Sequence, residues 1–265
     1  MPTPPDDTTV NHSELVVAVA FMQPACNMHC TFCVTEDNFD TMTQSQVETL
    51  LIYLKKLGVK SLVIGGGEPF DWPGDLIAIS QYAKQLGFRT VQVGTNGIAL
   101  PDDFTSIKSI DRFVIPIESA NPEPHNMMRL YQNQHHRIIM SRLDKLKQAN
   151  KSVTLSTVIT QVNKDEILQL AEFIRQYNED TNHVHAWHLY QFIPIGRGGA
   201  VHGDQLRIEP EEYDAIVESV KALKLPFQVY RRSDMYASQT VDFFWYRNGE
   251  IQRGSQVWNQ TQSVQ

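Results

Sequence analysis

The three cysteines of this chain lie close together, in the stretch PACNMHCTFCV at residues 24–34. Cys26, Cys30 and Cys33 have the spacing Cys-x3-Cys-x2-Cys, and the 265-residue sequence has no other cysteine. Three cysteines do not make a disulfide framework, and close cysteines in a reducing compartment indicate metal or redox chemistry. Thiolates select soft metals and iron–sulfur clusters. A structural zinc site needs four ligands, whereas three thiolates on a four-iron cluster leave one iron open for a substrate or cofactor.

A glycine-rich motif, GGGEP, follows at residues 65–69. Glycines let a backbone approach a ligand closely because they lack a Cβ atom. The cysteine spacing and this motif together resemble the signature of the radical S-adenosylmethionine (SAM) enzymes. Phe32, directly before Cys33, matches the aromatic residue common at that place in the family. The resemblance covers roughly residues 15–195, and it implies one [4Fe–4S] cluster held by the cysteines with SAM on the open iron.

The resemblance also assigns residues to the SAM site, most of them directly after candidate strands. Glu118 ends an apolar stretch, where a carboxylate is costly unless it is hydrogen-bonded. Asn96-Gly97 is equally a turn, and Asn163 is equally a helix cap. The residues that the resemblance implies for SAM binding are Phe32, Gly66, Gly67, Glu68, Pro69, Thr95, Asn96, Glu118, Ser119, Thr157, Gln191 and Phe192.

By resemblance, the reduced cluster cleaves SAM to a 5′-deoxyadenosyl radical, which abstracts a hydrogen atom from a small-molecule substrate. The net reaction is then a dehydrogenation, an epimerisation or a rearrangement, and the electron comes from a flavodoxin- or ferredoxin-type reductant. An anionic substrate group is one expectation, and a surface arginine or a plain loop is the alternative at each position. The substrate candidates are Arg129, Tyr190, Arg197 with its neighbouring glycines, Arg231 and Arg232.

Other functions stay open at this point. Among single-cluster relatives the layout is most similar to the viperin family, which dehydrates nucleotides, although the basic residues that hold a triphosphate are not evident. Peptide modification, a zinc-stabilised binding protein with His29 or a distant histidine as fourth ligand, and an electron-carrying cluster protein are further alternatives. The absence of cysteines after Cys33 predicts a single cluster and argues against a methyl-accepting cysteine.

The elements that position these motifs alternate between apolar strands and helical patterns. Such alternation predicts an α/β fold with parallel strands, either a doubly wound sheet or a partial (β/α)6 barrel, with chemistry at the carboxyl ends of the strands. The family resemblance favours the partial barrel. The predicted strands are residues 15–22, 61–64, 90–94, 112–118, 153–159 and 184–192; the predicted helices lie within 43–58, 74–86, 123–150, 164–177 and 211–223.

The C-terminal part differs from this alternation. VDFFWYRNGEIQRG predicts a β-hairpin that turns at Asn248-Gly249 and closes one end of the sheet. We expect a disordered lead at 1–12, the barrel core at 13–200, a C-terminal extension at 201–254 and a frayed tail at 255–265. The formal net charge of −7 argues against nucleic acid, and we expect no membrane contact and a cytoplasmic location.

Overall fold

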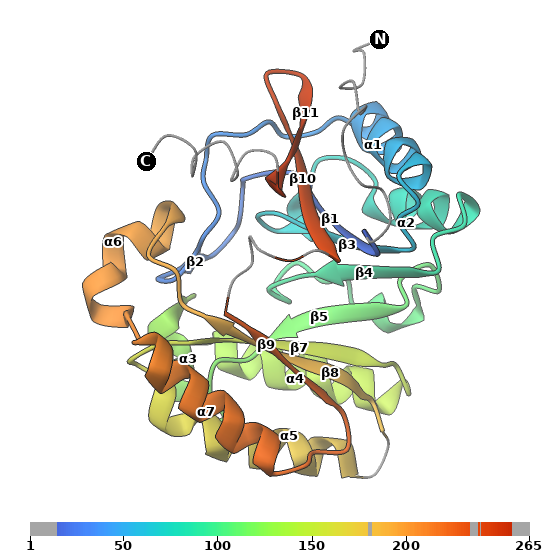
Figure 1. Ribbon diagram of the computed structural model, residues 1–265. Coiled ribbons are helices and arrows are strands. Elements are labelled where there is room, and N and C mark those ends of the chain that lie inside the picture. Colours follow the sequence, from blue (N-terminus) through green and yellow to red (C-terminus); the bar gives the residue numbers. More distant parts are fainter. Residues whose placement is uncertain (1–14, 180–181, 234–237, 239, 256–265) are drawn as a thin grey trace.

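The computed structural model describes residues 15–179, 182–233, 238 and 240–255. They form a curved nine-stranded sheet with the order β11-β10-β1-β3-β4-β5-β7-β8-β9, seen as a partial barrel in Figure 1. Neighbouring strands of this sheet are parallel, except that β11 is antiparallel to β10. The strands are β1 (Val17–Phe21), β3 (Ser61–Gly65), β4 (Thr90–Gly94), β5 (Arg112–Pro116), β7 (Val153–Ile159), β8 (Val184–Gln191), β9 (Gln228–Arg232), β10 (Val241–Arg247) and β11 (Glu250–Arg253), with a separate ladder of β2 (His29–Cys30) and β6 (Arg129–Leu130).

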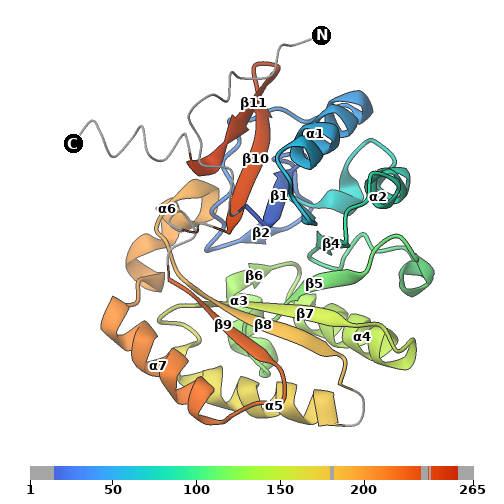
Figure 2. The ribbon, with the colours of Figure 1, turned by 45° about the vertical axis from the view of Figure 1, so that its right-hand side comes forward.

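Helices cover the outer face of the sheet, as Figures 1 and 2 show. Helix α1 begins at a capping box, in which Thr43 and Gln46 satisfy each other's backbone N–H groups. Asp75 caps α2 by accepting a hydrogen bond from the Ala78 amide. The helices are α1 (Gln44–Lys56), α2 (Leu76–Gln85), α3 (Pro122–Met128), α4 (His135–Gln148), α5 (Ile167–Glu179), α6 (Gly196–Leu206) and α7 (Pro210–Ala222), with short 3-10 turns η1 (Pro69–Asp71), η2 (Phe104–Ser106) and η3 (Lys164–Glu166).

The two faces of the sheet differ in burial. Along each strand, side chains alternate between the outer face and the inner, concave face. In β1, β3 and β4 the outer positions are buried in the core against the helices, as Ala18, Leu62 and Val91 are. The inner positions of the same strands, among them Val19 and Gln92, are only partly buried. The inner face is therefore not packed solid like the interior of a TIM barrel, and it is open to ligands.

The predicted α/β partial barrel is confirmed, and it has more parallel strands than expected. The strands predicted at 90–94 and 153–159 match β4 and β7 residue for residue, and the other four agree within two residues at each end. Three features were not predicted from the sequence: β9, the β2–β6 ladder and α6, whose four glycines disfavour a helix. The long helix expected within 123–150 is divided into α3, β6 and α4.

The predicted C-terminal hairpin is present. Asn248 and Gly249 both have positive φ angles, 54° and 79°, as a two-residue turn between right-twisted strands requires. β10 also pairs with β1 in parallel, so the hairpin extends the sheet. The lead expected at 1–12 and nearly all of the tail expected at 255–265 lie outside the described residues.

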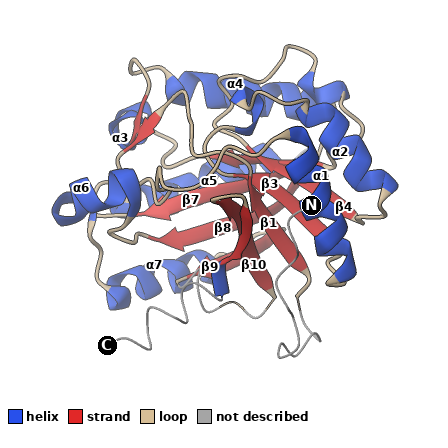
Figure 3. Ribbon diagram, turned by 90° about the horizontal axis from the view of Figure 1, so that it is seen from above, coloured by secondary structure: helices blue, strands red, loops and turns tan. Residues whose placement is uncertain are grey.

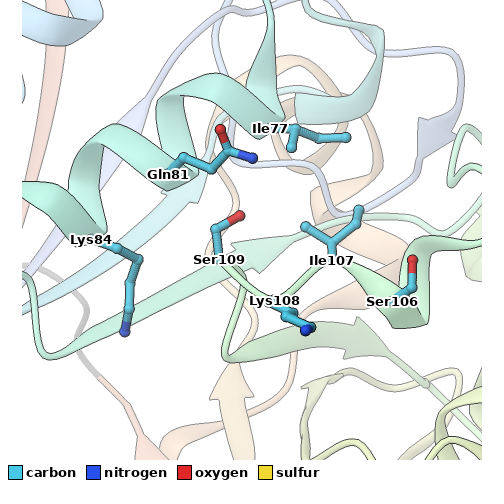
Figure 4. A pocket seen from close by; sticks show the side chains of 7 residues that line it. All are labelled: Ile77, Gln81, Lys84, Ser106, Ile107, Lys108 and Ser109. Atoms are coloured by element: carbon cyan, nitrogen blue, oxygen red, sulfur yellow. The ribbon is translucent and has the colours of Figure 1, made fainter.

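Two surface findings complete the fold. No helix in the described residues is both long enough and apolar enough to span a bilayer. A shallow pocket of about 550 Å³ lies between α2 and residues 106–109. Figure 4 shows Gln81 and Lys84 from α2 on one side of it and Ser109 on the other. None of the residues that line this pocket belongs to the predicted cluster, SAM or substrate sites.

Candidate active site around the cysteine loop

The cysteines lie on the loop that leaves β1, residues 22–35, which we call the cysteine loop. Cys30 sits in β2 directly opposite Arg129 in β6, and the Cys33 amide donates to the Cys30 carbonyl at 3.2 Å. Helix α6 packs on the other side of the loop, where the Gly198 and Gly199 amides donate to the Cys33 carbonyl at 3.1 and 3.2 Å. Figure 3 shows α3 and α6 beyond the arrowheads of β7 and β8, so both helices lie at the carboxyl ends of these strands.

Each cysteine sulfur faces a nitrogen donor. Asn96 Nδ2 lies 3.6 Å from Cys26 Sγ, and Arg129 Nη1 lies 3.5 Å from Cys30 Sγ. The Arg197 guanidinium interacts electrostatically with the Cys33 sulfur. Donors directed at sulfur suit sulfur atoms that carry negative charge, as thiolates bound to iron do.

Burial raises the pKa of Cys26 and raises that of Cys30 to about 12, which favours neutral thiols unless a metal takes up the charge. In the described residues, no three Cys, His, Asp or Glu side chains converge on the position of a single metal ion. A four-iron cluster binds each cysteine through a different iron, so its ligands need not converge on one point. Three half-buried thiols on one loop, each near a nitrogen donor, therefore fit the cluster that the sequence implies.

The GGEP motif packs directly on the cysteine loop. The Gly67 amide donates to the Gln23 carbonyl at 2.7 Å, and the Glu68 amide donates to the Ala25 carbonyl at 2.9 Å. A Cβ atom on Gly67 would lie 1.8 Å from the Ala25 oxygen, and one on Gly66 would lie 2.6 Å from the Gln23 oxygen. These glycines therefore allow the turn after β3 to touch the backbone of the cysteine loop. From the sequence we expected a ligand to make this close approach.

The Glu68 carboxylate joins the ends of β3 and β4. It is fully buried and accepts hydrogen bonds from the Phe70 amide at 3.0 Å, the Thr95 hydroxyl at 2.8 Å and the Asn96 amide at 2.7 Å. Burial raises the pKa of Glu68 to about 7, although the three hydrogen bonds oppose this shift. Glu68 thus positions Asn96, whose side chain reaches Cys26.

A buried ion pair holds the opposite side of the cysteine loop. Arg129 Nε donates to Glu118 Oε1 at 2.7 Å, and the Val158 amide donates to Glu118 Oε2 at 2.7 Å. The Arg129 guanidinium lies 5.0 Å from the centre of the Phe32 ring. Asn163 Nδ2 donates to the Glu118 carbonyl at 2.8 Å, and its side chain makes no helix-capping bond. Arg129, predicted as a substrate contact, pairs with Glu118, lies over the Phe32 ring and donates to Cys30.

Two histidines connect the Glu118 side of the site to the Asn96 side. The Glu118 amide donates to His125 Nδ1 at 3.1 Å, so His125 Nε2 carries the proton toward His135 Nδ1, 2.8 Å away. His135 Nε2 then donates to the Asn96 carbonyl at 2.8 Å. Burial lowers the pKa of both rings, that of His135 to about 3, so both are neutral near pH 7. The sequence analysis missed this pair, because neither histidine adjoins a motif.

A second group of polar side chains lies on the inner face of β8 and β9. We call His188, Tyr190, Tyr230 and Arg232 the inner-face cluster. Arg232 Nε donates to His188 Nδ1 at 3.3 Å, and its guanidinium lies 4.9 Å from the Tyr230 ring centre. Arg231, the neighbour of Arg232, points to the outer face and pairs with Asp214 of α7.

The remaining predicted residues are placed by their contacts. Thr157 is buried, donating to the Ile117 carbonyl and accepting from Trp187, and Ser119 is buried beside Glu166. Arg197 donates to the Pro24 carbonyl at 2.7 Å and pairs with Asp37, so its guanidinium braces the cysteine loop. Gln191 lies on the opposite face from Tyr190, and Phe192 is buried in the core. Of the residues predicted from the sequence, the structure brings together the cysteines, Phe32, residues 66–69, Thr95 and Asn96 around the cysteine loop. Three others, Thr157, Gln191 and Arg231, do not lie on the inner face of the sheet.

Comparisons with known proteins identify the family of this chain. The family model of the radical SAM superfamily matches residues 21–174. GTP 3′,8-cyclase 1 of Mycobacterium tuberculosis is 23% identical over 189 residues, which cover 67% of this chain and 50% of that protein. A probable GTP 3′,8-cyclase of Saccharolobus solfataricus is 29% identical over 208 residues, covering 76% of this chain and 64% of that protein. The chain thus spans half to under two thirds of the length of these relatives.

The fold is also similar to solved structures. The crystal structure of Streptococcus suis SuiB bound to S-adenosylmethionine matches with a TM-score of 0.69 at 14% identity. The match covers 90% of this chain and 60% of SuiB. At this identity the match shows the shared partial-barrel fold alone.

Proposed function

Because this chain belongs to the radical SAM superfamily and is a radical SAM enzyme, we propose that it abstracts a hydrogen atom from a small-molecule substrate bound on the inner face of the sheet. We further propose that Cys26, Cys30 and Cys33 hold one [4Fe–4S] cluster. When bound, the cluster and SAM supply one-electron reductive cleavage and a 5′-deoxyadenosyl radical. The protein's own contribution is binding, orientation and the exclusion of water.

The cysteine loop is the part of the chain proposed to hold the cluster, and its neighbours fix its shape. Asn96 and Arg129 donate to two of the sulfurs, and Arg197 braces the third. The Glu68 carboxylate already accepts three hydrogen bonds, so we assign it to positioning. We therefore expect residues 66–69, at the carboxyl end of β3, to contact SAM through their backbone. Asn96, at the carboxyl end of β4, is the side chain that we expect to contact SAM beside them.

The inner face is the proposed place of reaction. Inner positions of the strands are partly exposed at Gln92 in β4, Val114 in β5, Ser156 and Val158 in β7, and His188 and Tyr190 in β8, so a substrate can lie against them. Holding the target carbon beside SAM replaces a bimolecular encounter by an oriented one, an effect worth several kcal/mol. Apolar inner positions such as Val19, Val63 and Val114 offer no hydroxyl or thiol hydrogen for a reactive radical.

The observation that carries this proposal is that all three thiols are held in one loop with a nitrogen donor at each sulfur. The test is anaerobic reconstitution followed by reduction with dithionite in the presence of SAM. We expect brown protein with about four iron and four sulfide per chain, and release of 5′-deoxyadenosine. A colourless protein that binds one zinc ion and leaves SAM intact would contradict the proposal.

The substrate is the second question for experiment. The curated relatives are named for a reaction of GTP, so GTP belongs in the first panel, beside sugars, peptides and other nucleotides. The panel is supplied with deuterium at carbon-bound positions. The substrate is the compound that transfers deuterium into 5′-deoxyadenosine, whereas a compound that leaves it unlabelled is excluded.

A further inference from the structure

The inner-face cluster combines one cation with three aromatic rings. The His188 ring lies 5.0 Å from the Tyr230 ring and 6.0 Å from the Tyr190 ring, measured between centroids. The Tyr190 hydroxyl lies 3.4 Å from His188 Nδ1, the same atom that accepts from Arg232. Burial and the nearby Arg232 lower the pKa of His188 to about 3, so the ring is neutral near pH 7. Arg232 is thus the only charged member of the cluster.

The charge of Arg232 has no carboxylate partner in the described part of the chain. Other arginines near the site do have one: Arg129 pairs with Glu118, and Arg197 pairs with Asp37. The contrast is sharpest with Arg231, which pairs with Asp214 at 2.7 Å. A half-buried cation without an anion is unfavourable, since desolvation is not offset by an opposite charge. An anionic ligand would supply that offset.

The position of Arg232 is fixed by the fold. Its amide donates to the Tyr213 hydroxyl at 3.0 Å, and this hydroxyl donates in turn to the Leu189 carbonyl at 2.7 Å. Tyr213 is fully buried in α7, so it links helix α7 to both β8 and β9. In the parallel register Arg232 lies opposite Tyr190, one residue before the end of β8. The guanidinium therefore projects from a rigid strand at the same end of the sheet as the cysteine loop.

We propose that Arg232, with Tyr190 and Tyr230, forms a subsite for a single oxyanion, either one carboxylate or one phosphoryl group, of the substrate. The role of this subsite in the reaction rests on the proposed function. One guanidinium matches one carboxylate or phosphoryl group in a two-pronged contact. The tyrosine hydroxyls supply further donors, and the rings contact the apolar part of the ligand. A triphosphate needs several cations, and the described cluster supplies one.

The test uses the anaerobically reconstituted holoenzyme and three probes: sodium phosphate, sodium acetate and GTP. Thermal unfolding is followed for the wild type, Arg232→Gln, Arg232→Lys and the matched control Arg231→Gln, with sodium chloride at equal ionic strength as reference. A ligand that binds only the folded state raises the unfolding midpoint. We expect phosphate or acetate to raise it by a few degrees above chloride in the wild type and in Arg231→Gln. Arg232→Gln should lose this shift, and Arg232→Lys should keep part of it.

Three outcomes would overturn the inference. They are no stabilisation beyond chloride, an equal shift in Arg232→Gln, or stabilisation by GTP alone, which would indicate a polyphosphate site. The same preparations are assayed for 5′-deoxyadenosine without substrate. Failure of the wild type in that assay contradicts the proposed function but leaves anion binding intact. Arg231→Gln, whose site lies on the outer face, should cleave SAM at the wild-type rate and keep the anion stabilisation.

Discussion

At the scale of single residues, the site depends on two buried carboxylates with different partners. Glu68 accepts only neutral donors, whereas Glu118 pairs with Arg129. Sequence indicated both, Glu68 through the GGEP motif and Glu118 through its place at the end of an apolar strand. Arg129 was not predictable as a neighbour of Cys30, because the contact joins residues 99 positions apart through a two-residue ladder.

The first prediction concerns Glu68 and pH. Its pKa of about 7 in the folded protein exceeds the reference value of 4.5, so between these values the folded state binds more protons than the unfolded state. The free energy of unfolding should therefore fall as pH rises from 4.5 to 7 and become flat above, by roughly 3 kcal/mol in total. Denaturant titrations of apo protein across this range, in wild type and Glu68→Gln, measure it. Equal pH dependence in both proteins would show that Glu68 is not the group responsible.

The second prediction concerns Arg129. Replacing it with Gln removes a positive charge and a donor from the Cys30 sulfur, so the cluster's reduction potential should become more negative. Because this change alone leaves Glu118 buried and unpaired, the Glu118→Gln/Arg129→Gln double variant accompanies it. Redox titration of the cluster without SAM, monitored by electron paramagnetic resonance, gives the potential. Arg231→Gln is the control, and a potential that matches wild type in both Arg129 variants contradicts the prediction.

At the scale of elements, the site is built where three segments meet the cysteine loop. The turn after β3 contacts it through Gly67, β6 contacts it through Arg129, and α6 contacts it through Gly198. A Cβ atom on Gly198 would lie 2.2 Å from the Cys30 oxygen. Gly196 and Gly198 therefore stand in α6 because a side chain there would meet the distant cysteine loop, and their low helix propensity is why the sequence did not predict this helix.

The third prediction compares two neighbouring glycines. Gly67→Ala would place a Cβ atom 1.8 Å from the Ala25 carbonyl oxygen, so the cysteine loop must move. Gly65→Ala meets its nearest atoms only at 3.7 Å, an ordinary contact, and serves as the control. We expect Gly67→Ala to lose most of its iron and sulfide after reconstitution, while Gly65→Ala keeps wild-type content. Equal loading of the two variants, measured by iron and sulfide analysis, would refute the packing argument.

At the scale of the whole molecule, the alternation of strands and helices predicted an α/β fold with parallel strands, and the family resemblance then favoured the partial barrel over a doubly wound sheet. β9 escaped prediction because QVYRR is short and largely exposed, so its sequence lacks an apolar stripe. The residues of the inner face are also hard to predict from sequence. Their side chains are half-exposed, and we expect bound ligands, rather than neighbouring side chains, to cover them. Packing of the outer face, by contrast, is complete without any cofactor.

The fourth prediction follows from that packing. The triple variant Cys26→Ala/Cys30→Ala/Cys33→Ala should fold and unfold cooperatively, with a midpoint within a few degrees of the apo wild type. The core lies between the sheet and its outer helices, and removing three sulfurs leaves it intact. Circular dichroism and thermal unfolding measure this, with apo wild type as reference. A variant that is unfolded at room temperature would instead support the zinc-stabilised alternative.

The pairing of β1 with β10 has a consequence for biosynthesis. β1 ends at Phe21, but β10, which completes its second edge, begins at Val241. A ribosome adds about 5–20 residues per second, so this edge stays unpaired for on the order of ten seconds or longer during translation. Asp40, just beyond the cysteine loop, is held by the Tyr246 carbonyl and the Gly249 amide. The segment that holds the cysteines is therefore secured by a turn 209 residues later in the chain, and we expect cluster insertion to follow synthesis of the whole sheet.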